Sequence, residues 1–188
     1  MSGRCFSYLM MILWFFTGTS LYAYETSKVE RVFDGDGIQI SNLQNIHLLG
    51  VDAPEAIQDS KLYHDAKVYK LDIYGTMGLG KSSKQFLRYL VQDEAVRVEY
   101  DEKTKDKKGL RNAYVYLPVC KGKCEYTPQE GYDYVTLDDG VYVFVNATMI
   151  KSGYAIVRES DLDAKNKEQF KQFEKSAQDR GMGFWAKR

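Results

Sequence analysis

The segment 31–55 constrains the fold more than any other part of the chain, because it places acidic residues at the ends of short apolar stretches. The strands expected there are 29–33, 37–40 and 46–51. Asp34 and Asp36 lie between the first two strands, and Asp52 and Glu55 follow the third. If the strands are neighbours in one sheet, these carboxylates meet at one of its ends. Such a group, with few side-chain nitrogens nearby, suits a hard cation such as Ca²⁺ or Mg²⁺.

Each acidic motif has a simpler explanation when it is taken alone. Asp-Gly is common in tight hairpin turns, so the segment 34–37 needs no further role. The segment 52–55 has the spacing of a helix capping box, with Pro54 in the first turn. An EF-hand loop is excluded because Ile38 stands at the third ligand position. Taken singly, both motifs are explained by local structure.

Taken together, the two motifs resemble the staphylococcal nuclease (thermonuclease) family. Asp-Gly-Asp is followed by a strand that ends in Leu-Leu-Gly-Val-Asp-Ala-Pro-Glu, and the resemblance continues at 98–116, 145–155 and near Trp185. It implies an α+β fold that is mainly a β-barrel: an OB-fold, a five-stranded Greek-key barrel with three packed α-helices. It also implies a nuclease that hydrolyses phosphodiester bonds of DNA, RNA or both.

The resemblance assigns roles within the acidic segment. Asp36 and Asp52 match direct Ca²⁺ ligands, and the Ala53 carbonyl matches a backbone ligand. Asp34 would support the metal site from behind these ligands. Glu55 matches the carboxylate that activates the attacking water, after which the 5′-oxygen leaves phosphorus. Ca²⁺ is therefore the expected cofactor, with Mg²⁺ and Mn²⁺ as alternatives.

Two positions depart from the family pattern, and in both the family has an arginine. His47 stands five residues before Asp52, and imidazole is shorter than guanidinium and only partly charged at neutral pH. After Gly109 the chain has Leu110, and Arg111 comes one residue late. In a regular strand that shift turns the side chain to the other face, unless a bulge restores its direction. We expect Arg111 to substitute for the family arginine, with reduced catalytic activity.

The alternatives for these residues are structural: His47 as a strand residue with a satisfied ring, and Arg111 as a solvated surface side chain. Lys107 matches a phosphate contact of the family, and Lys108 replaces a neighbouring tyrosine. The loop around them is either a basic substrate-binding patch or an ordinary charged loop. The expected partner is DNA or RNA, in single-stranded form.

The overall charge does not favour polyanion binding, because 26 Lys and Arg balance 26 Asp and Glu. Any affinity for nucleic acid must come from a local patch. Two other functions therefore stay open. One is a catalytically weakened OB-fold protein that binds nucleic acid without cleaving it. The other is a secreted interaction module whose insertion contacts a protein.

Residues 1–23 have the pattern of a secretory signal peptide, with a single charge at Arg4, an apolar run over 6–16 and small residues after it. That run is short for a spanning helix, so an uncleaved membrane anchor is the less favoured alternative. The remaining chain, 24–188, is long enough for one domain with its own core. We expect a secreted or periplasmic monomer without stable membrane association.

Two of the three cysteines, Cys120 and Cys124, remain after removal of the signal peptide. In an exported protein this spacing predicts a short-loop disulfide. A zinc site is less favoured, because the chain has only two histidines to complete it. The pair lies in an insertion at about 118–140, to which the sequence assigns no function.

Apolar periodicity predicts the other elements of the chain. The expected helices are 81–92, 146–153 and 164–180, and the further strands are 94–101, 112–117 and 141–145. The segment 56–80 is polar and rich in glycine and tyrosine towards its end. It is expected to be a long surface loop with at most a short helical turn.

Overall fold

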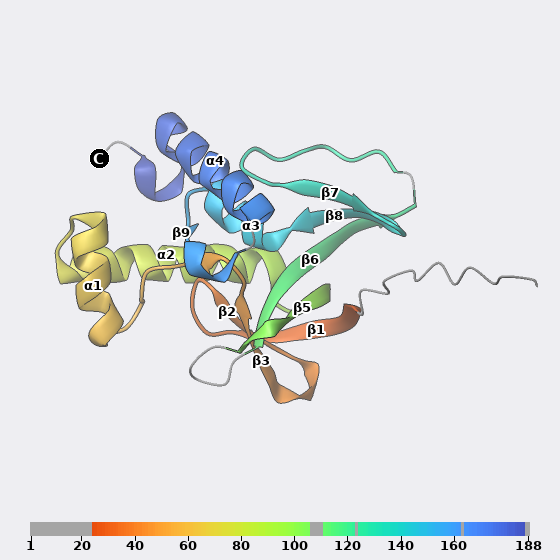
Figure 1. The fold of residues 1–188 in the computed structure, drawn as a ribbon, viewed down its shortest axis with the longest axis horizontal. Helices are drawn as coiled ribbons and strands as arrows, with labels where there is room; N and C mark the ends of the chain where they lie inside the picture. Colours follow the sequence, from red (N-terminus) through yellow and green to blue (C-terminus); the bar gives the residue numbers. More distant parts are fainter. Residues whose placement is uncertain (1–23, 106–110, 123, 163, 187–188) are drawn as a thin grey trace, which may run out of the picture.

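The computed structural model describes residues 24–105, 111–122, 124–162 and 164–186 (Figure 1). The expected signal peptide, residues 1–23, and the predicted phosphate contacts Lys107 and Lys108 lie outside these ranges. Within them, no helix combines the length and the apolar character needed to cross a membrane.

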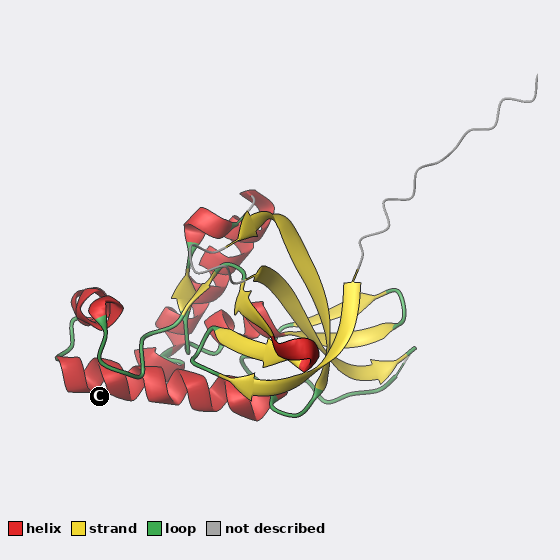
Figure 2. Ribbon diagram, turned by 90° about the horizontal axis from the view of Figure 1, so that it is seen from below, coloured by secondary structure: helices red, strands yellow, loops and turns green. Residues whose placement is uncertain are grey.

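The centre of the molecule is a five-stranded β-barrel. Its strands are β1 (Tyr24–Val32), β2 (Gly37–Ile40), β3 (Gln44–Leu48), β5 (Ala95–Lys105) and β6 (Arg111–Lys121). Antiparallel pairing runs in the order β3-β2-β1-β5-β6, and β3 also pairs in parallel with β6. That last pairing closes the sheet, and the strands are seen to wrap around in Figure 2. The predicted α+β class and OB-type barrel are confirmed.

Strand β6 continues beyond the barrel and extends the sheet. It pairs with β8 (Gly140–Phe144), which pairs in turn with β7 (Tyr134–Leu137). The segment 118–140, which was expected to be an insertion, contains the end of β6, the loop after it and β7 (Figure 1). It begins with a disulfide between Cys120 and Cys124, whose Cα atoms are 6.4 Å apart.

The barrel interior is filled by alternate strand residues. Val29, Ile38, Val98 and Val115 are completely buried there. Full burial of one such side chain contributes about 1.5–3 kcal/mol, so the alternating pattern supplies much of the driving force for closure. Phe170 of the last helix reaches the same core and ties the helical layer to the barrel.

The described residues form four α-helices: α1 (Ser60–Tyr69), α2 (Ile73–Val91), α3 (Val145–Lys151) and α4 (Ala164–Arg180). Helices α2, α3 and α4 lie near the barrel, and α1 packs against α2 at the end farther from the barrel (Figures 1 and 2). Short elements complete the described chain: β4 (Val51–Asp52), β9 (Ile156–Val157), and the 3₁₀ turns η1 (Ser41–Leu43), η2 (Glu159–Asp161) and η3 (Gly183–Trp185). Helix α3 packs against both α4 and β6.

The prediction of a loop over 56–80 was wrong, because this segment forms α1 and the first part of α2, and α1 is a helix in addition to the three expected. Asp59 caps α1 by accepting a hydrogen bond from Leu62 N at 2.9 Å, and Asp72 caps α2 by accepting one from Gly75 N at 2.6 Å. Each cap satisfies backbone N–H groups that the first turn leaves unpaired. The polar composition of α1 and the glycines in α2 weaken the apolar period on which the prediction depended.

One of those glycines brings α2 close to the acidic segment. A Cβ atom on Gly80 would lie 2.3 Å from the carbonyl oxygen of Glu55, so only glycine allows this approach. Three residues later, Ser83 Oγ donates a hydrogen bond to the Tyr154 carbonyl at 2.6 Å. Helix α2 therefore supports the backbone on which the acidic residues stand.

Candidate active site

The acidic motif 34–37 is both a tight turn and part of a charged site. Phe33 N donates to the Gly37 carbonyl at 2.9 Å, which closes the turn between β1 and β2. Asp36 N donates to Asp34 Oδ1 at 3.2 Å, so the Asp34 side chain folds back over its own turn. A Cβ on Gly37 would lie 2.6 Å from that oxygen, which explains the glycine. The local explanation and the functional one are therefore compatible.

The second acidic motif meets the first at the end of the barrel. Asp52 ends β4, and Asp36 Oδ2 accepts a hydrogen bond from the backbone N–H of the next residue, Ala53, at 3.1 Å. Glu55 follows in the loop before α1, and its own N–H donates to Asp65 Oδ2 at 3.1 Å. We call Asp34, Asp36, Asp52, Glu55 and Asp65 the carboxylate cluster.

Lys61, in the first turn of α1, reaches into the carboxylate cluster. Its Nζ lies 2.5 Å from the Ala53 carbonyl oxygen and 3.2 Å from Asp52 Oδ1. It lies 3.4 Å from Asp65 Oδ2 and 3.6 Å from Glu55 Oε1. Burial opposes the charge of this ammonium, but the carboxylates, Asp52 first among them, outweigh burial and raise the pKa of Lys61. The ammonium therefore stays protonated at neutral pH.

Arg158, the residue that directly follows β9, also reaches the cluster. Strand β9 pairs with β4, with Ile156 opposite Asp52, and Arg158 N donates to the Gly50 carbonyl at 2.9 Å. The Arg158 guanidinium then lies with Nη2 at 2.8 Å from Asp52 Oδ1 and at 3.4 Å from Asp36 Oδ2. Two carboxylates thus share one guanidinium nitrogen.

The two cations act differently on the two aspartates. Burial would raise the pKa of Asp52, but Lys61 and Arg158 hold it below its usual value. Asp36 is more deeply buried, so burial and then the nearby Asp34 carboxylate raise its pKa well above the usual range. Burial also raises the pKa of Glu55, against the opposing effect of Lys61.

His47 completes the arrangement. Its Nδ1 lies 2.9 Å from the Asp36 carbonyl oxygen, and its Nε2 contacts Nη1 of Arg158. A carbonyl oxygen only accepts and a guanidinium only donates, so Nδ1 carries the proton and Nε2 accepts. The ring is therefore a neutral imidazole that holds Arg158 against the carboxylates.

Comparison with known proteins agrees with this geometry. Residues 45–187 match the family model described as staphylococcal nuclease homologue.

The chain belongs to this family.

Thermonucleases from Staphylococcus hyicus and Staphylococcus intermedius are each 32% identical to it over 96 residues, which is 50% of this chain and 49% of theirs. The chain thus spans about half the length of the curated relatives it matches. The resemblance noted in the sequence is confirmed.

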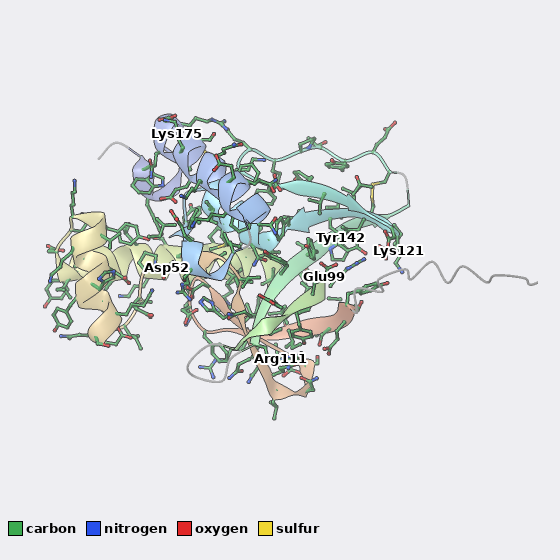
Figure 3. The ribbon with its side chains drawn as sticks, viewed as in Figure 1. Asp52, Glu99, Arg111, Lys121, Tyr142 and Lys175 are labelled. Carbon is green, nitrogen blue, oxygen red and sulfur yellow. A yellow bond between two sulfur atoms is a disulfide. The ribbon has the colours of Figure 1, made fainter. Side chains whose placement is uncertain are left out.

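Arg111, the residue expected to replace a displaced arginine of the nuclease family, lies elsewhere. In the β3–β6 pairing its partner is Ile46, whereas His47 pairs with Asn112. The Arg111 guanidinium carbon lies 3.6 Å from the ring centroid of Tyr100. Figure 3 shows Arg111 well separated from Asp52. Its role in substrate binding stays a prediction.

The fit to a metal ion depends on the Lys61 position. Across the residues that the structure describes, no group of three or more His, Cys, Asp or Glu side chains is arranged to hold a metal ion. Lys61 and Arg158 lie among the carboxylates. The oxygens within 3.6 Å of Lys61 Nζ nevertheless come from carboxylates and one backbone carbonyl, which is the donor set of Ca²⁺. The residues fit such a cation once Lys61 withdraws.

Sequence reasoning missed Lys61 and Arg158 as site residues. The signal for Lys61 was available: Asp59 can cap a helix, and Lys61 then lies one turn before Asp65. No local signal identifies Arg158. It is 106 residues from Asp52 in sequence, and only the pairing of β4 with β9 brings the two together.

Proposed function

We propose that this protein is an exported, Ca²⁺-dependent nuclease that hydrolyses phosphodiester bonds in DNA, RNA or both. The observation that carries the proposal is the convergence of Asp52, Glu55 and the Ala53 carbonyl on one cationic atom, Lys61 Nζ. Membership of the staphylococcal nuclease homologue family supports it. Residues 1–23 would act as a signal peptide, and 24–188 as a single monomeric domain.

In this proposal Asp36, Asp52 and the Ala53 carbonyl hold the metal, and Asp34 fixes the turn that carries Asp36. Bound there, Ca²⁺ would polarise a phosphate oxygen and offset the charge that develops on it. Glu55 would accept a proton from the attacking water as that oxygen bonds to phosphorus and the 5′-oxygen leaves. Mg²⁺ and Mn²⁺ are the alternative ions.

Substrate contacts come from outside the carboxylate cluster. We propose that Lys107 and Lys108 bind phosphates of a single-stranded substrate, and that Arg111 contributes from its place over Tyr100. The charges of these side chains are needed because the protein as a whole has no net charge to attract a polyanion.

A second candidate function is supported by two observations. His47 is uncharged in its hydrogen-bonding arrangement, and Arg111 stacks on Tyr100. Both positions where the family carries a cation are thus altered. An OB-fold protein that binds single-stranded nucleic acid without cleaving it is the alternative, and binding without Ca²⁺-dependent cleavage would identify it.

The test is hydrolysis of single-stranded DNA and of RNA by the purified protein, with Ca²⁺ and then with excess chelator. We expect cleavage only with Ca²⁺, and a loss of about 10²–10⁴-fold in Glu55→Gln because its general base is removed. The matched control is Glu30→Gln, which changes an exposed glutamate on β1 and should leave the rate unchanged. Equal rates for wild type and Glu55→Gln, or equal rates with and without Ca²⁺, would contradict the proposal.

A further inference from the structure

We infer that Arg158 is the guanidinium that binds the substrate phosphate at this site, and that His47 is the residue that positions it. The inference rests on the proposed function and adds a residue to it. It starts from the contact of one side chain with three parts of the site: Asp52, Asp36 and His47.

The backbone of Arg158 is held in place by hydrogen bonds that do not depend on its side chain. Its N–H bonds to the Gly50 carbonyl at 2.9 Å, and the preceding residues of β9 pair with β4. The residue before it, Val157, also donates its N–H to Glu174 Oε2 of α4 at 3.2 Å. The guanidinium is therefore preorganised, which is the condition for a cation that stabilises charge during a reaction.

The position of the guanidinium suits a phosphate. A phosphate that binds a metal held by Asp36 and Asp52 must lie beside those carboxylates, and Nη2 of Arg158 is 2.8 Å from one and 3.4 Å from the other. The side chain is 27% exposed, so solvent and substrate have access to it. Guanidinium has five N–H donors in a planar fork, which allows two hydrogen bonds to one phosphate.

His47 explains why the guanidinium stays in place when the carboxylates turn to a metal. Its Nε2 contacts Nη1 of Arg158 and lies farther, at 3.8 Å, from Asp36 Oδ2, and its Nδ1 is held by the Asp36 backbone carbonyl at 2.9 Å. An arginine at position 47 would place a second guanidinium against the first. A neutral imidazole accepts a hydrogen bond there instead, so His47 and Arg158 work as a pair.

The first test measures binding without cleavage. In a Glu55→Gln background, single-stranded oligodeoxynucleotide binding is titrated at saturating Ca²⁺, and Ca²⁺ binding is measured separately by calorimetry. We expect the added Arg158→Ala change to weaken oligonucleotide binding by about tenfold or more and to strengthen Ca²⁺ binding, because a competing cation is removed. Weaker oligonucleotide binding together with stronger Ca²⁺ binding distinguishes the loss of a phosphate contact from a general loss of structure, which would weaken both. Arg88→Ala, an exposed arginine on α2, is the matched control.

The second test removes the guanidinium at position 158 and places one on β3, at position 47. Arg158→Ala alone should lower kcat/KM by about 10²–10³-fold, and Arg158→Lys should restore only part of it because an ammonium lacks the planar fork. The double variant His47→Arg with Arg158→Ala should recover most of the lost activity.

The inference is overturned if Arg158→Ala binds oligonucleotide as tightly as its parent, or if Ca²⁺ and oligonucleotide affinities fall together. The binding result is independent of whether the wild-type protein cleaves nucleic acid. Failure of the nuclease proposal and failure of the Arg158 inference are thus distinguishable.

Discussion

Two ionic clusters lie on opposite sides of the molecule and differ in how their charges are balanced. Figure 3 shows Asp52 of the carboxylate cluster on one side and Glu99 with Tyr142 on the other. We call Arg97, Glu99, Asp139, Tyr24 and Tyr142 the Arg97 cluster. The carboxylate cluster sets five acidic residues against the two cations of Lys61 and Arg158.

The Arg97 cluster is an ordinary structural ion pair with supporting contacts. Arg97 Nη2 and Nε donate to Glu99 Oε1 at 2.8 and 3.2 Å, and its guanidinium lies over the Tyr24 ring at 3.6 Å. Tyr142 OH donates to Asp139, whose side chain is half exposed. Water therefore solvates the excess acid here.

The carboxylate cluster is much less exposed to solvent. The side chains of Asp36 and Asp65 are only 12% and 4% exposed. Buried carboxylates that lack enough counter-charge destabilise a fold, and such groups are retained where function requires them. Both clusters hold more acid than base, but the Arg97 cluster leaves its excess acid exposed to water, whereas the carboxylate cluster buries it, as expected for the proposed binding site. The expected effects of substitution in the two clusters are therefore opposite.

Among the substitutions that test this comparison, Asp36→Asn has the largest expected effect. It should lower the rate of the proposed nuclease reaction by about 10²–10³-fold, because Asp36 is a proposed metal ligand. It should also raise the free energy of unfolding by about 1 kcal/mol without metal, because a buried charge beside Asp34 disappears. Parallel rate measurements and urea denaturation check both halves. A lower free energy of unfolding for Asp36→Asn than for wild type would contradict the difference drawn between the two clusters.

Next in size is Arg97→Met, which should lower the free energy of unfolding by about 1–2 kcal/mol. It removes two hydrogen bonds and leaves Glu99 without its cation. The nuclease rate should stay within about twofold of wild type, because the change is remote from the carboxylate cluster. Urea denaturation with Arg88→Met as the exposed control measures the difference. A large loss of activity with unchanged stability would contradict the structural role.

The smallest effect is expected for Lys61→Met. Methionine keeps an unbranched side chain only one heavy atom shorter, but removes the ammonium that competes for Asp52, Glu55 and the Ala53 carbonyl. Affinity for Ca²⁺ should rise about tenfold, which is about 1.4 kcal/mol. Calorimetric titration measures it, with Lys67→Met on the exposed face of α1 as control. Unchanged affinity would show that Lys61 already lies outside the metal position.

The strands and the acidic turns were predictable because their signals are local, whereas their closure into an OB-type barrel was expected from the resemblance to the staphylococcal nuclease family. Val96 and Val98 alternate with polar residues, and both are completely buried in β5. The Asp-Gly-Asp turn follows from the turn chemistry of its residues. Helix α1 was missed because its polar sequence has only a weak apolar period, although the Asp59 cap was visible.

By itself the sequence determined the strands and the acidic turns that carry Asp36, Asp52 and Glu55, since strand period and turn type depend on neighbouring residues. Only the tertiary structure decided which cations face them. The pairing of β4 with β9 brings in Arg158 from 106 residues away, and the β3–β6 register sets Asn112, not Arg111, beside His47. Such pairings depend on the packing of the whole chain, which no local pattern records.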